Sequence, residues 1–250
     1  MGNLDNNALY GLLLSLGTFL LSMFLTPFYT HVAYKYHFWK KQKKTTVSGD
    51  GLPIMTKLHA HKFKRVFPTM AGIIGVIAVT MVTLLCNFDR AQTWLPIFGF
   101  LGGAIVGLID DGINVFGSGE GAAGLRAKIK FAMITVVSLV LGWFFAYKLG
   151  WTSIHIPFTG DIEIGGVVMV GLFTFAVVAT SNAVNISDGL DGLAGGLAMM
   201  AYGAFGTIAL FRGQVYLFAF CMTVVGWLFS YVWFNVPPAR FMMGDVGSFA

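Results

Sequence analysis

Seven apolar runs, each close to the length that a helix needs to cross a lipid bilayer, constrain this chain more than any other feature. They lie near residues 8–29, 68–85, 93–109, 130–147, 166–184, 190–210 and 216–234. About 20 helical residues cross the roughly 30 Å of hydrocarbon in a membrane. Only 11% of the residues are charged, against about 25% in soluble domains. The sequence therefore predicts an all-α integral membrane protein, a polytopic bundle with seven transmembrane helices.

The positive charges indicate how these helices are oriented. Thirteen of the 16 Lys and Arg residues fall on the side that holds the loops 33–67 and 110–129, when Lys130 is counted with them. Cytoplasmic loops carry such an excess, so this side is predicted to be cytoplasmic and the N-terminus to lie outside. The net charge of +5 then reflects topology, and no nucleic-acid partner is expected.

Two shorter patterns predict local structure. Within residues 154–164, isoleucines alternate with polar or small residues on both sides of a Thr-Gly pair, which is typical of a short β-hairpin, here on the outer side. Gly99, Gly103 and Gly107 repeat at the GxxxG spacing, and this predicts close packing between helices.

Five of the 11 acidic residues lie at the predicted cytoplasmic ends of apolar runs. They are Asp110, Asp111, Asp188, Asp191 and Asp245. Asp188 and Asp191 are three residues apart at a predicted helix start, where they would share one face. Each acid taken alone could be a solvated loop residue or a helix cap. Together, carboxylates near hydrocarbon indicate function, and a divalent cation such as Mg²⁺ is the natural partner for the cluster.

Lysines precede two of the runs on the same side. Lys64 lies before the second run, and Lys130 begins the fourth. Topology and snorkelling to the headgroups would explain either lysine alone. Combined with the carboxylates, they favour metal-assisted transfer of a phosphoryl group.

Four segments resemble the motifs of bacterial phospho-N-acetylmuramoyl-pentapeptide transferases. Residues 185–195, NISDGLDGLAG, resemble the family's NLTDGLDGLAGG segment. Residues 68–72 resemble TPTMGG, residues 107–111 resemble the start of DDxxK, and residues 238–248 resemble PA(K/R)xFMGDxGS. The PTM segment favours this branch over relatives that transfer N-acetylglucosamine-1-phosphate.

The resemblance implies a fold, a reaction and partners. The fold would be a ten-helix, usually dimeric protein of the bacterial inner membrane with a cytoplasmic active site. Residues 1–250 would be one transferase domain, incomplete at the C-terminus. The reaction would move phospho-N-acetylmuramoyl-pentapeptide from UDP to undecaprenyl phosphate, forming lipid I and UMP for peptidoglycan synthesis, with Mg²⁺ as cofactor.

The resemblance also assigns roles to single residues. Asp110, Asp111 and Asp245 match the catalytic aspartates, and Asp245 matches the metal ligand. Seven residues match substrate-binding positions: Lys64, Thr69, Lys130, Asn185, Asp188, Gly189 and Asp191. Asp191 would face the uracil.

Three departures from the family pattern keep alternatives open. Asn114 replaces the lysine of DDxxK, and Met242 replaces a phenylalanine that stacks on the nucleobase. Phe67 and Ala71 replace Thr and Gly of TPTMGG. The alternatives are a related transferase that uses UDP-N-acetylglucosamine or another UDP-sugar, an inactive homologue, and a transporter.

Overall fold

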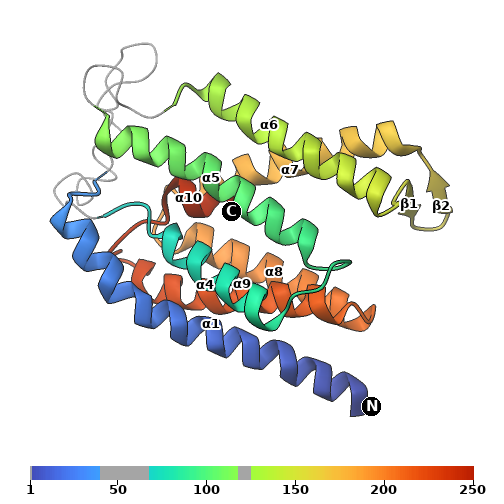
Figure 1. Cartoon of the computed structure of the whole chain (residues 1–250), viewed down its shortest axis with the longest axis horizontal. Helices are drawn as coiled ribbons and strands as arrows, with labels where there is room; N and C mark the ends of the chain where they lie inside the picture. Colours follow the sequence, from blue (N-terminus) through green and yellow to red (C-terminus); the bar gives the residue numbers. More distant parts are fainter. Residues whose placement is uncertain (1, 40–67, 118–124) are drawn as a thin grey trace.

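The computed structural model describes residues 2–39, 68–117 and 125–250 of the chain. The helices in these ranges run largely side by side, and a two-stranded hairpin lies at one end of them (Figure 1). The helices are α1 (Gly2–Lys35), α4 (Gly72–Cys86), α5 (Trp94–Phe116), α6 (Ala127–Trp143), α7 (Gly166–Ser187), α8 (Leu193–Phe211), α9 (Val215–Asn235) and α10 (Gly244–Phe249). A π-helical turn over Phe144–Lys148 continues α6.

Six of the described helices are long and apolar enough to cross a membrane: α1, α5, α6 with its π-helical turn, α7, α8 and α9. The predicted class, a polytopic all-α membrane protein, is confirmed. The predicted second span differs, because α4 has only 15 residues and is about 22 Å long. The chain before it, from Pro68 to Ala71, is drawn into a turn that pairs with residues 242–243.

Helix α1 distributes its side chains as a membrane helix does. Leu12, Leu16 and Leu20 are exposed, whereas Thr18 and Ser22 are completely buried. A soluble helix would do the reverse. Where lipid is the solvent, small and polar residues gather at helix interfaces, because they let backbones approach and hydrogen-bond.

Helix α9 is the most buried of the six candidate spans and forms the centre of the bundle with α1, α4 and α8 packed around it. Its Gly226 lies against the backbone of Ser15 in α1, and its Trp227 ring fills the space beside Gly75 of α4. The Trp227 ring also meets Phe100 of α5 edge to face, with centroids 6.3 Å apart. Aromatic rings and glycines thus join four helices around one core.

The predicted hairpin is confirmed. Strands β1 (Ser153–Ile156) and β2 (Gly160–Glu163) pair antiparallel, with Ser153 opposite Glu163 and Ile156 opposite Gly160. It connects the π-helical turn after α6 to α7.

The glycine repeat of α5 packs closely, as predicted, and places α10. A Cβ atom on Gly107 would overlap the backbone carbonyl of Asp245, and one on Gly103 would overlap the carbonyl of Phe249. Gly99 faces Leu141 of α6 instead. Because two of the three glycines leave room for the α10 backbone, Asp245 comes next to α5.

Candidate active site

Three buried carboxylates meet where α5 and α10 pack together. Asp110, Asp111 and Asp245 are 2%, 0% and 4% exposed. Each offers an oxygen that lies within 4.8 Å of the others'. Asp110 and Asp111 lie inside α5 rather than at its end as predicted, because the helix continues to Phe116. Two segments more than 130 residues apart in the chain therefore build one acidic cluster.

The ammonium group of Lys130 joins two of these carboxylates. Its Nζ lies 2.7 Å from Oδ2 of Asp110 and also pairs with Oδ2 of Asp245. The backbone N–H of Leu125 donates to the other oxygen of Asp110 at 2.6 Å. Charge-assisted hydrogen bonds of this kind fix a carboxylate firmly, so Asp110 is held from both sides.

Asp111 and Asp188 hold the backbone on both sides of Asp245. The N–H of Gly244 donates to Oδ2 of Asp188 at 3.2 Å, and the N–H of Val246 donates to Oδ2 of Asp111 at 3.1 Å. The first N–H groups of a helix have no partner within the helix, and side-chain oxygens normally satisfy them. Two aspartates from distant segments thus cap α10.

The placement of Asp188 and Asp191 corrects one sequence prediction. The two residues lie in the connection between α7 and α8 and not at a helix start. Helix α8 begins only at Leu193, after Gly192 in a left-handed conformation (φ 79°). Oδ2 of Asp191 accepts the N–H of Ala239 at 3.2 Å, so this aspartate holds the segment that leads to residue 245.

The other residues predicted to bind substrate lie in different surroundings. The amide of Asn185 donates to the Ser248 hydroxyl at 2.8 Å, again on α10. Thr69 is buried, and its carbonyl accepts the Tyr29 hydroxyl. Gly189 is exposed in the α7–α8 connection. Lys64 lies outside the described residues.

The segment at 68–72 lies against residues 242–244. The N–H of Gly72 donates to the Met243 carbonyl at 2.8 Å, and the N–H of Met242 donates to the Pro68 carbonyl at 2.9 Å. Gly72 also lies so close to Gly247 that a Cβ would overlap its backbone. The three other segments that carry family motifs are thus gathered around α10, which belongs to the fourth.

Sequence reasoning missed two polar residues of α9. The Tyr231 hydroxyl accepts the Met243 N–H at 3.0 Å. The Asn235 amide accepts the Gly192 N–H at 2.7 Å and donates to the Phe241 carbonyl at 2.9 Å. Both lie in the last turns of an apolar run, where an uncharged polar side chain without a partner is costly. This energetic cost could have indicated from sequence that both side chains form hydrogen bonds, but it does not identify their partners.

The chain matches the model of glycosyl transferase family 4 over residues 93–250. The chain belongs to this family. A relative from Chloroflexus aggregans is 33% identical over 245 residues, which are 95% of this chain and 64% of the relative. Relatives from Levilactobacillus brevis and Lactobacillus helveticus are 36% and 37% identical over 76% of this chain and 60% and 59% of theirs. All three are named phospho-N-acetylmuramoyl-pentapeptide-transferase.

These relatives confirm the resemblance that the motifs predicted. The chain spans about 60% of the length of the curated relatives it matches. The matched region of the family model includes α5 to α10, and hence all three carboxylates of the cluster.

The structure also places the departures from the family pattern. Asn114 is buried on α5, one turn beyond Asp110 and on the same face. Phe241 is 2% exposed, with its ring packed against Tyr29 and Phe234. A ring in the core cannot stack on a nucleobase, so Phe241 does not compensate for Met242, which is only partly buried.

The cluster fits a divalent cation. Among the described residues, this is the one group of three or more potential ligands close enough to share an ion. All three are carboxylates, and Mg²⁺ prefers oxygen ligands, usually one or two carboxylates with water and phosphate. Their burial keeps the ligand oxygens in place.

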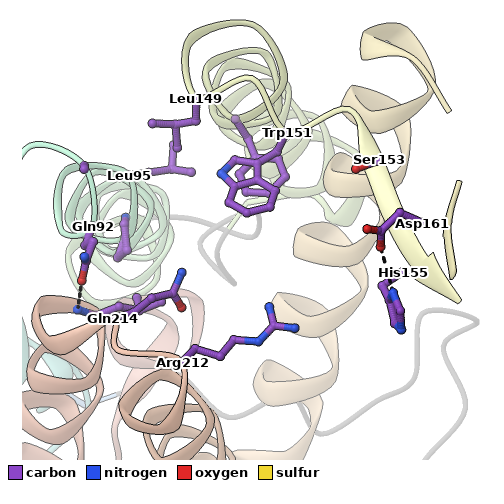
Figure 2. A pocket seen from close by; sticks show the side chains of 13 residues that line it. Gln92, Leu95, Leu149, Trp151, Ser153, His155, Asp161, Arg212 and Gln214 are labelled. Atoms are coloured by element: carbon purple, nitrogen blue, oxygen red, sulfur yellow. Dashed lines mark hydrogen bonds and ion pairs between the residues drawn. The ribbon is translucent and has the colours of Figure 1, made fainter. Parts of the chain in front are cut away.

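A cavity of about 680 Å³ lies at the opposite end of the helices. Pro96 in its wall is 14 residues before Asp110 on α5, which is about 21 Å along the helix. Figure 2 shows Arg212, Trp151 and the His155–Asp161 pair around the cavity, with 2.8 Å between the paired atoms. It lacks the convergent carboxylates of the cluster, so the acidic cluster is the candidate active site.

Proposed function

We propose that this chain transfers phospho-N-acetylmuramoyl-pentapeptide from its UDP carrier to undecaprenyl phosphate, forming lipid I and releasing UMP. The observation that carries the proposal is the meeting of Asp110, Asp111 and Asp245 with Lys130. Buried carboxylates, one lysine and a multi-pass membrane bundle suit phosphoryl transfer between a soluble nucleotide and a lipid phosphate. The names of the relatives specify the sugar and the peptide.

Each residue of the cluster has a distinct proposed role. Asp245 holds Mg²⁺, with Asp110 and Asp111 beside it. The bound ion supplies positive charge that stabilises the diphosphate and the leaving UMP. Asp110 takes the proton of undecaprenyl phosphate, whose oxygen then attacks the β-phosphorus of the donor. Lys130 contributes a point charge to the phosphates.

The proposed nucleotide residues also organise the site. Asp188, Asp191 and Asn185 bond to the backbone or side chains of residues 239–248. Their position around α10 supports a nucleotide that binds beside Asp245. Lys64 and Thr69 are proposed to contact the nucleotide from the segment before α4.

The proposed setting is the bacterial inner membrane. The acidic cluster lies toward the side that holds 13 of the 16 Lys and Arg residues, so we assign the active site to the cytoplasm and the N-terminus to the outside. The homodimer expected from the family stays a prediction.

UMP release tests the reaction and the metal together. The full chain in detergent receives undecaprenyl phosphate and UDP-N-acetylmuramoyl-pentapeptide, with and without Mg²⁺. We expect Mg²⁺-dependent release, and a loss of at least about 100-fold in Asp245→Asn, because an electrostatic stabiliser of the transition state is removed. Asp161→Asn, exposed on the hairpin, is the matched control. Equal rates in Asp245→Asn and the control would refute the assignment.

Two additional arms of this assay address the alternatives. UDP-N-acetylglucosamine as donor tests the related transferase that uses another UDP-sugar. Consumption of that donor alone would make the sugar assignment wrong. UMP released without the lipid acceptor would indicate a covalent aspartyl-phosphate intermediate instead of direct attack.

A further inference from the structure

Lys130 bridges two carboxylates of the acidic cluster. Its Nζ contacts Oδ2 of Asp110 and Oδ2 of Asp245, two of the three carboxylates that lie close enough to share an ion. An ammonium group and a metal ion cannot both occupy the space between the same two oxygens. The ammonium group therefore offsets part of the negative charge of the cluster.

The lysine side chain is more exposed and more flexible than the two carboxylates that it contacts. It is 21% exposed, whereas the side chains of Asp110 and Asp245 are 3% and 6% exposed. It rises from the first turn of α6, on a flexible four-carbon stem that can swing without a movement of the helix. Its Nζ also lies 5.5 Å from the centre of the Phe249 ring. The two carboxylates are more buried, and Asp110 also accepts the Leu125 N–H, so the lysine is the partner with more freedom to change position.

We infer that Lys130 is the internal counter-ion of the metal-free site and that the divalent cation displaces it. The displaced ammonium then pairs with a phosphate of the substrate, which couples metal binding to anion binding. This inference rests on the proposed function for the metal. Coupling between two ligands is reciprocal: an anion that accepts Lys130 tightens the binding of the cation, and the cation tightens the binding of the anion.

Binding of Mn²⁺, followed by electron paramagnetic resonance, tests the displacement without any measurement of activity. The full chain in detergent is compared with Lys130→Gln and with Lys128→Gln. Lys128 is exposed two residues earlier on α6, so its variant loses the same charge outside the cluster. Lys130→Gln is expected to bind Mn²⁺ roughly 5- to 150-fold more tightly than the unaltered chain, the usual range of coupling between sites. Lys128→Gln is expected to match the unaltered chain.

Inorganic phosphate tests the coupling. Phosphate is expected to tighten Mn²⁺ binding to the unaltered chain and to Lys128→Gln, and to have no such effect on Lys130→Gln. The same response in all three chains would overturn the coupling. Unchanged or weaker Mn²⁺ binding by Lys130→Gln would overturn the displacement, while the metal site itself would stand. If neither the unaltered chain nor Lys130→Gln bound Mn²⁺, the proposed metal role would fail as well.

A second measurement needs no substitution and so does not depend on the folding of a variant. Amine-reactive labelling followed by mass spectrometry reports how accessible Lys130 is in the unaltered chain. Mg²⁺ is expected to increase the labelling of Lys130 and to leave that of Lys128 unchanged. Labelling of Lys130 that does not respond to Mg²⁺ would overturn the displacement.

Discussion

Tyr231 shows at the residue scale how the site depends on groups that never reach the carboxylate cluster. Its hydroxyl accepts the Met243 N–H at 3.0 Å and lies 3.5 Å from Oδ1 of Asp188. Asp188 in turn accepts the Gly244 N–H. One phenol and one carboxylate thus fix the two residues before Asp245. Tyr231 is a positioning residue, since it acts through the backbone.

Tyr231→Phe is expected to lower the free energy of unfolding by about 1–3 kcal/mol, because the buried Met243 N–H loses its acceptor. Mn²⁺ affinity is expected to fall as well, since Asp245 is held less firmly. Unfolding in detergent and Mn²⁺ binding measure the two effects. Tyr36→Phe, at an exposed position, is the control. A Tyr231→Phe chain as stable as this control would contradict the positioning role.

At the scale of elements, α10 is a six-residue helix that could not persist alone, since isolated helices of fewer than about 12 residues are marginal in water. Its neighbours hold it. The α5 glycines accommodate its backbone, Asp111 and Asp188 cap its first turn, and Asn185 bonds its Ser248. The position of Asp245 therefore depends on α5, α7 and the connection between α7 and α8.

Gly107→Ala tests this dependence, because its new methyl group would overlap the Asp245 carbonyl. Overpacking of this kind is expected to cost about 1–3 kcal/mol of stability and to weaken Mn²⁺ binding by shifting Asp245. Gly112→Ala on the same helix is the matched control, because a Cβ there meets nothing within 4 Å. Its stability is expected to be unchanged or higher. If both variants behaved alike, contact between α5 and α10 would not position the site.

Across the whole molecule, two polar regions lie apart along the helices. The hairpin and the cavity beside Arg212 lie at one end (Figures 1 and 2). The carboxylate cluster lies about 21 Å further along α5, measured from Pro96 in the cavity wall to Asp110. Between them, exposed leucines and phenylalanines cover helices such as α1. This arrangement is what a bilayer requires, with polar groups at both water interfaces and apolar side chains against lipid.

The sidedness of the two ends can be measured by cysteine labelling. Lys128→Cys and Arg212→Cys are each made in a chain whose own cysteines, Cys86 and Cys221, are replaced by serine and alanine. A membrane-impermeant maleimide is expected to label position 212 in intact spheroplasts and position 128 only after permeabilisation. The positive-inside rule gives this direction. The reverse pattern would place the carboxylate cluster outside.

The sequence alone determined the class of protein, the hairpin and the identity of the acidic residues. Backbone groups in lipid have no water to bond to, so an apolar run of sufficient length must be helical. Two-residue alternation indicates strands just as locally. Motifs at 185–195 and 238–248 then identified the family, because they are read residue by residue.

Only the tertiary structure decided which partners those acids have. Asp188 caps a helix 56 residues later in the chain, and Lys130 reaches Asp245 across 115 residues. Local pattern placed Asp188 at the start of α8 and began the second apolar helix at Pro68, whereas α8 begins at Leu193 and α4 begins at Gly72. Long-range contacts decide both positions. The turn before α4 pairs with residues 242–243, and the backbone of α10 donates hydrogen bonds to the aspartates. Such contacts depend on which helices meet, and a local sequence pattern does not contain that information.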